Sequence, residues 1–185
     1  MTYRRTLREL AFETHGVVTS RSAQSVGVPS VELRKLAARG ALTRLGQGVY
    51  RMDEAPAGEL DEYAQAVALV GDGAVLADEA VLAAHHLAQV NLRRIRVASS
   101  RRVRARLPGT VEVIRRDVPE HQRDSIDGVP AMTIESAILG AHGRIMTERL
   151  VEAAHQARER GLLDPDAEAR IVAALGTSTR STFQG

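Results

Sequence analysis

The 185-residue sequence predicts an α+β protein of two parts, a small domain of helices with a two-stranded hairpin and then a small mixed sheet packed with helices. Apolar residues recur at helical spacing in segments that end at glycines. Other short segments alternate apolar and polar residues as strands do. Asp53–Gly58 has the composition of a linker. We therefore expect domains at residues 1–56 and 57–176 and a flexible tail at residues 177–185.

The first part shows the element order of a winged helix-turn-helix. The expected elements are a helix that starts after Thr2 and stops at His15-Gly16, an extended Val17-Val18, a brief helix capped by Thr19 or Ser20 that runs through Ser25, a helix from Pro29 to Arg39, and strands at Leu42–Leu45 and Val49–Met52. Gly27 and Gly40 supply turns on either side of the third helix. Gly46-Gln47-Gly48 forms the hairpin tip, or wing.

The third helix has the two faces that a helix in the major groove of DNA requires. One face carries Pro29, Leu33, Leu36 and Ala37, and the other side carries Val31, Arg34, Lys35, Ala38 and Arg39. Arg34 or Lys35 can read a guanine, whereas wing residues would meet the backbone or the minor groove. The expected DNA contacts are Ser20, Arg21, Ser30, Val31, Arg34, Lys35, Arg39, Arg44 and Gln47. The competing interpretation is a solvated helix followed by a hairpin. RNA or single-stranded DNA fits less well, because the chain has only three Tyr, two Phe and no Trp.

The second part is predicted from the same signals. Its expected elements are helices at Glu59–Val70 and Leu76–Leu87, strands at Arg94–Ala98 and Thr110–Arg115, a hairpin at Ser125–Val129 turned at Asp127-Gly128, a helix capped by Thr133 that runs through Ala141, and helices at Arg144–Arg160 and Pro165–Leu175.

Charge is segregated along the chain. Residues 1–52 carry a net +6, residues 53–90 a net −8, residues 91–123 a net +7, and residues 124–185 a net −3. Such a pattern indicates more than one charged partner surface, or charge matching between the parts of the fold. A candidate partner surface or second anion-binding surface comprises Arg93, Arg94, Arg96, Arg101, Arg102, Arg104 and Arg106. This segment is either a solvated basic sheet edge or an anion-facing surface. Because an acidic stretch separates it from the first basic block, we expect it to serve the second domain rather than operator reading.

Catalytic and cofactor sites are not indicated. The chain has no cysteine, which excludes disulfides and thiolate chemistry and is typical of a reducing compartment. Adjacent helical histidines point about 100° apart, so His85-His86 favours one buried and one surface histidine over a metal site. We find no phosphate-binding loop, nucleophile elbow or kinase signature. We therefore expect no enzyme, no cofactor and no metal. No apolar run is long enough for a signal peptide or a membrane span, so a cytoplasmic protein is expected.

Four segments in order resemble the AbiEi family of antitoxins from bacterial type IV toxin–antitoxin systems. They are Gly16–Arg21 and Gly40–Tyr50 in the winged helix, Ala74–Leu87, and Asp127–Thr133 before a helix. Together they span about residues 15–140. The sequence departs from the family at Ala77 and Asp78, which replace a common Ser-His pair, and at His86, which replaces a glycine.

The resemblance implies a non-enzymatic protein whose winged helix binds repeats in its own promoter and represses the operon. Its second domain would help to neutralise a separately encoded, nucleotidyltransferase-like toxin. The main alternative is a stand-alone winged-helix regulator whose second domain senses a ligand or mediates assembly. An enzyme that acts on a partner protein, such as an atypical kinase, ranks below both because no motif supports it.

Overall fold

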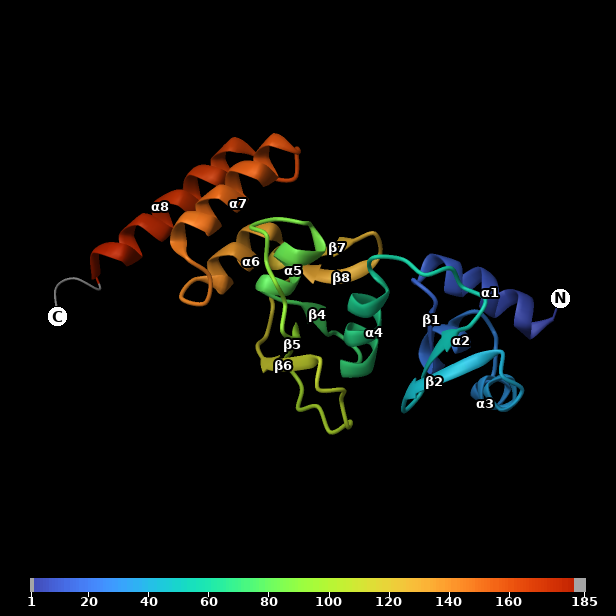
Figure 1. The fold of residues 1–185 in the computed structure, drawn as a ribbon. Helices are drawn as coiled ribbons and strands as arrows, with labels where there is room; N and C mark the ends of the chain where they lie inside the picture. Colours follow the sequence, from blue (N-terminus) through green and yellow to red (C-terminus); the bar gives the residue numbers. More distant parts are fainter. Residues whose placement is uncertain (1, 182–185) are drawn as a thin grey trace.

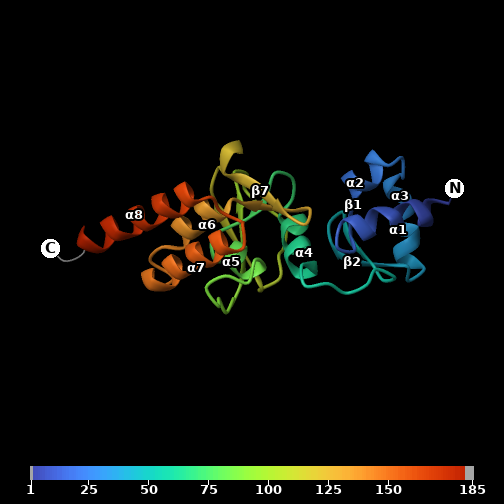
Figure 2. The same ribbon diagram turned by 90° about the horizontal axis from the view of Figure 1, so that it is seen from above.

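The computed structural model describes residues 2–181 and shows an elongated α+β molecule. The N-terminal domain lies at one end, and the helix pair α7 (Thr147–Glu159) and α8 (Pro165–Ser181) lies at the other (Figures 1 and 2). This confirms the predicted fold class.

The N-terminal domain has the helix order and the wing that the sequence predicts. Its elements are α1 (Tyr3–Glu13), β1 (Val17–Thr19), α2 (Ser20–Ser25), α3 (Ser30–Ala38), β2 (Leu42–Gly46) and β3 (Val49–Met52). The strands form one antiparallel sheet in the order β1-β3-β2. Helix α2 begins with a capping box in which the Thr19 hydroxyl accepts from the Ser22 amide at 3.0 Å. Gly40 ends the turn after α3 with φ +74°, a conformation that favours glycine.

A separate hydrophobic core holds this domain together. Leu7 of α1, Val18 of β1 and Leu33 of α3 are fully buried in it, together with Met52 of β3. Burying a large aliphatic side chain stabilises a fold by roughly 1.5–3 kcal/mol. The domain therefore has the core that independent folding requires.

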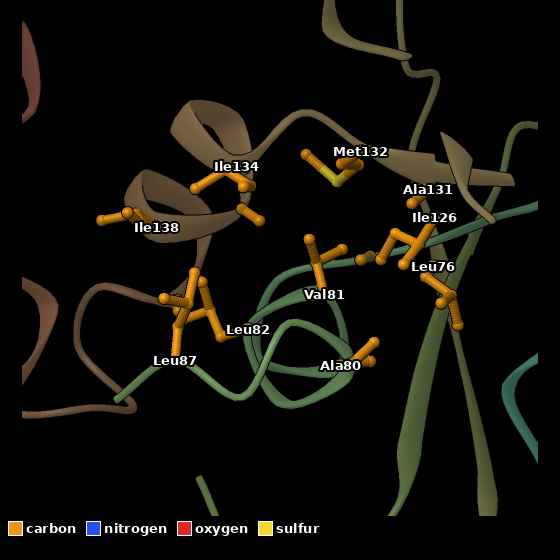
Figure 3. Packing of buried hydrophobic residues seen from close by; sticks show 14 of the residues in the cluster. Leu76, Ala80, Val81, Leu82, Leu87, Ile126, Ala131, Met132, Ile134 and Ile138 are labelled. Atoms are coloured by element: carbon orange, nitrogen blue, oxygen red, sulfur yellow. The ribbon is translucent and has the colours of Figure 1, made fainter. Parts of the chain in front are cut away.

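The second domain is built on a mixed five-stranded sheet. Its elements are α4 (Asp61–Val70), β4 (Val75–Leu76), α5 (Glu79–Ala84), β5 (Ile95–Ser99), β6 (Val111–Arg115), the 3₁₀ turn η1 (Glu120–Gln122), β7 (Arg123–Ile126), β8 (Val129–Met132), α6 (Ile134–Ala141), α7 (Thr147–Glu159) and α8 (Pro165–Ser181). The strand order is β6-β5-β4-β8-β7, with parallel pairs β5–β6 and β4–β8. Helices α5 and α6 pack with the sheet around Leu76, Val81 and Ile138, which are fully buried (Figure 3).

The expected helix at Leu76–Leu87 is wrong in its first part. Val75 and Leu76 instead form the central strand β4, because Leu76 pairs with Val97 of β5 and Ala131 of β8. Asp78 has φ +52° and ψ −124°, so a helix cannot continue through it, and α5 spans only Glu79–Ala84. Pairing with distant strands overrides the helical spacing of the apolar residues in this segment.

The last two helices also differ from the expected bounds. Helix α7 begins at Thr147 rather than at Arg144, whose guanidinium turns back to Asp78 at 2.7 Å. Helix α8 runs to Ser181, beyond the expected end at Leu175 and into the segment expected to be a tail. Residues 182–185 of that tail lie outside the described residues.

Helix α4 lies between the two domains and packs on both sheets (Figure 1). The linker residues 53–58 form no helix or strand. Two ion pairs join the domains: Arg51 with Asp61 at 3.2 Å and Arg21 with Asp72 at 3.1 Å. The winged helix therefore packs against the second domain and is not merely tethered to it by a flexible linker.

Candidate nucleic-acid interface

Helix α3 keeps its apolar side on the domain and turns its polar side outward. Leu33 is fully buried and Leu36 is 9% exposed, and both belong to the N-terminal core. The side chains on the other side are exposed: Val31, Arg34, Lys35, Ala38 and Arg39. Ser30 begins the helix and is half-buried. Apart from Pro29, which is exposed just before the helix, this arrangement agrees with the helical projection of the sequence and suits insertion into the major groove.

The cations of α3 differ in whether they are already paired within the protein. Lys35 Nζ lies 2.8 Å from Glu32 Oε1 on the same helix. Within the described part of the chain, the guanidinium groups of Arg34 and Arg39 make no hydrogen bond or ion pair. A base contact by Lys35 must first break its pair with Glu32, whereas Arg34 has no such competitor. Arg34 is therefore the better placed of the two to reach a guanine edge.

The wing carries exposed polar side chains next to α3. Helix α3 packs on β2, and β2 pairs with β3 in a register that shifts between Arg44 and Gly46. Arg44 Nε donates to the Gly46 carbonyl at 3.2 Å, which folds the side chain along the wing. Gln47 is exposed at the tip. Arg44 and Gln47 thus lie where a winged helix meets the DNA backbone.

Ser20 and Arg21 lie elsewhere, at the start of α2. The Ser20 amide donates to the Gly48 carbonyl at 2.8 Å, and Arg21 pairs with Asp72 after α4. Both line a groove of about 410 Å³ between the domains, and Gln47 reaches the same groove. The structure therefore brings Ser20 and Arg21 next to the second domain instead of the outward face of α3.

Residues 5–52 match the family model described as "Transcriptional regulator, AbiEi antitoxin". The N-terminal domain is an AbiEi-type regulator domain. The match covers α1 through the wing and ends where β3 ends. No curated protein matches the chain.

The arginine segment Arg93–Arg106 of the second domain does not form one surface. Arg96 is half-buried among carboxylates, while Arg93 and Arg94 line a groove of about 490 Å³ together with Glu79 and Glu112. The remaining four are exposed on the connection between β5 and β6: Arg101, Arg102, Arg104 and Arg106. The expected role of this segment, contact with an anionic partner, therefore has to be considered separately for each arginine.

A buried charge cluster at Asp78 was not anticipated from the sequence. The Asp78 carboxylate is fully buried and accepts from Arg116 Nη1 at 2.6 Å, from Arg144 Nη2 at 2.7 Å and from Arg96 Nη1 at 3.2 Å. Arg96 also donates to Glu112 at 2.8 Å. That hydrogen bond raises the pKa of the Arg96 guanidinium and lowers the pKa of the Glu112 carboxyl, although partial burial opposes both shifts. The cluster joins β4, β5 and the turns after β6 and α6, so its role is to hold the second domain together.

The adjacent histidines behave as surface and packing groups. His86 is exposed and its Nε2 lies 3.2 Å from Glu59 Oε2. His85 is half-buried, and burial, followed by the nearby Arg160, lowers its pKa. Among residues 2–181 no group of three or more His, Asp or Glu side chains is arranged to hold a metal ion. None of the helices in this range is long and apolar enough to cross a membrane.

Proposed function

We propose that this chain is a cytoplasmic DNA-binding antitoxin of the type IV class, which represses its own operon and neutralises a nucleotidyltransferase-like toxin encoded with it. The observation that carries the DNA-binding part is the outward polar face of α3 on a domain that matches an AbiEi regulator model. Of the three cations on this face, Arg34 and Arg39 are exposed and have no partner among the described residues, whereas Lys35 pairs with Glu32.

Each interface residue then has a distinct task. Arg34 donates to a guanine edge, and Lys35 and Arg39 supply further contacts in the groove. Ser30 meets a phosphate at the start of α3, and Val31 offers an apolar contact to a thymine methyl. Wing residue Arg44 contacts the backbone and adds affinity without sequence preference.

Neutralisation is assigned to the second domain, without catalysis. The family description of the N-terminal domain as an antitoxin supports this assignment. The second domain has its own core and its own charge cluster, so it is a folded module and not an extension of the DNA-binding domain. A folded module of this kind can present a surface to a partner protein.

The DNA-binding part is tested with the full chain and a reporter gene driven by the region upstream of its own gene. We expect repression in cells and salt-dependent binding of the same duplex in solution, because cation–phosphate contacts release counterions. The double variant R34A/K35A should lose repression. R149A is a matched control, because Arg149 is exposed on α7 in the second domain. Unchanged repression by R34A/K35A, or an equal loss in R149A, contradicts the assignment of α3.

The neutralisation part is tested by co-expression with the product of the neighbouring gene. We expect rescue of growth, and R34A/K35A should still rescue when both genes are driven from an unrelated promoter. A neighbouring product that is not toxic, with repression by the chain intact, would favour the stand-alone regulator instead.

A further inference from the structure

The wing and the second domain share a basic groove. It has a volume of about 420 Å³ and is lined by Arg44, Leu45, Gly46, Gln47, Leu69, Arg104, Ala105 and Arg106. Three of these residues are arginines, and none is a carboxylate. The groove therefore gathers positive charge from two segments that lie sixty residues apart in sequence.

Helix α4 brings these segments together. Leu69, near the end of α4, packs against the wing so closely that a β-carbon at Gly46 would lie 2.6 Å from its Cδ2 atom. Helix α4 also packs on β5, which leads into the connection that carries Arg104 and Arg106. Figure 1 shows this connection, between β5 and β6, on the same side of the molecule as the end of the wing.

The acidic stretch between the two segments does not reach the groove as free charge. Asp61 and Asp72, which flank α4, are paired with Arg51 and Arg21. Separation by negative charge was the reason to expect that the arginine segment is unrelated to operator reading. For Arg104 and Arg106 that separation exists along the chain but not in space.

Arg104 and Arg106 are exposed, and within residues 2–181 their guanidinium groups make no hydrogen bond or ion pair. Cations gathered without carboxylates repel one another, and a line of phosphates relieves that repulsion. The groove continues the interface, since its other wall, Arg44, belongs to β2, on which α3 packs.

We propose that Arg104 and Arg106 contact the phosphate backbone of duplex DNA together with Arg44, so that the β5–β6 connection extends the wing. This inference rests on the proposed DNA-binding function. Duplex DNA is favoured over an acidic protein because the groove opens beside the wing, where the backbone passes when α3 enters the major groove. The second domain thereby contributes directly to operator affinity.

The test measures binding of the full chain to two duplexes, its own upstream region and a random sequence, at several salt concentrations. In R104A/R106A the slope of log K against log salt should become shallower by about 1.8, at about 0.9 per phosphate contact. Between 50 and 200 mM salt, that variant should therefore lose about 12-fold less affinity than the unaltered chain. Both duplexes should be weakened equally, because phosphate contacts carry no sequence information.

R101A/R102A is the matched control, since it removes the same charge from the same connection without touching the groove. It should keep the slope of the unaltered chain. An unchanged slope in R104A/R106A, or an equal change in the control, overturns the inference while the proposed function stands. An unchanged slope with weakened toxin neutralisation assigns these arginines to a protein partner and also overturns it. Absence of salt-dependent binding by the unaltered chain refutes the proposed function itself.

Discussion

Replacing Arg34 by alanine should reduce sequence discrimination while leaving the fold intact. Arg34 is exposed on α3, and no hydrogen bond or ion pair in the described part of the chain depends on it. An exposed substitution of this kind changes stability by about 0.5 kcal/mol or less. A bidentate contact between arginine and guanine contributes about 1–3 kcal/mol of discrimination. The preference for the cognate duplex over a random duplex should therefore fall by about 5- to 150-fold.

Lys35 provides a graded comparison on the same helix. Its ion pair with Glu32 at 2.8 Å competes with DNA, and an exposed pair of this kind is worth about 0–1 kcal/mol. Lys35→Ala should therefore cost less than Arg34→Ala. Glu32→Gln should strengthen binding of both duplexes, because it frees Lys35 and removes a negative charge from the interface.

The assay is fluorescence anisotropy with a labelled cognate duplex and a labelled random duplex at one fixed salt concentration. Circular dichroism melting checks that each variant is folded. If Arg34→Ala weakens both duplexes by the same factor, Arg34 contacts phosphate and not a base. If Glu32→Gln weakens binding, the ion pair orients Lys35 for DNA instead of competing with it.

Four further outcomes follow from the fold. Residues 1–56 alone should bind duplex DNA with a strong salt dependence, because they have their own core, and titration at several salt concentrations checks this. Arg44→Ala should weaken cognate and random duplexes equally and make the salt slope shallower by about 0.9, which the same titration measures. Asp78→Asn should destabilise the chain by about 1–3 kcal/mol in chemical denaturation, because the fully buried anion shared by three partly exposed guanidinium groups is lost. The hydrogen bond from Arg96 lowers the pKa of Glu112. The stability that this hydrogen bond contributes is therefore present above the ordinary glutamate pKa of 4.5 and is lost as the pH falls below it. Glu112→Gln should flatten the curve of stability against pH in this acidic range.

The AbiEi-type domain was predictable because its signals are local. A cap at Thr19, the turn glycine Gly40 and the apolar spacing of Leu33 and Leu36 each act within a few residues. These signals also identified the outward face of α3. The pairing of Lys35 with Glu32 was within reach as well, since the two lie three residues apart on one helix.

The second domain was harder because its signals are not local. Val75 and Leu76 become a central strand only through partners some twenty and fifty-five residues further along the chain. The helical spacing of this segment does not encode those partners. Asp78 likewise gains its arginines from three other segments. The sequence marked Asp78 as a departure from the family pattern, and nothing in the sequence indicated its arginine partners.

Ion pairs and hydrogen bonds within the fold account for most of the acidic charge between positions 53 and 90. Of the eight acidic residues between positions 53 and 90, seven have a hydrogen-bond or ion-pair partner, namely Asp53, Glu54, Glu59, Asp61, Asp72, Asp78 and Glu79. Their partners include cations from both basic blocks, such as Arg51 and Arg96. Among the described residues, the cations left without a hydrogen-bond or ion-pair partner include Arg34 and Arg39 on α3 and Arg104 and Arg106 on the β5–β6 connection. Helix α3 packs on the wing strand β2, and Arg104 and Arg106 line a groove with the wing, as the proposed contact with a phosphate backbone requires.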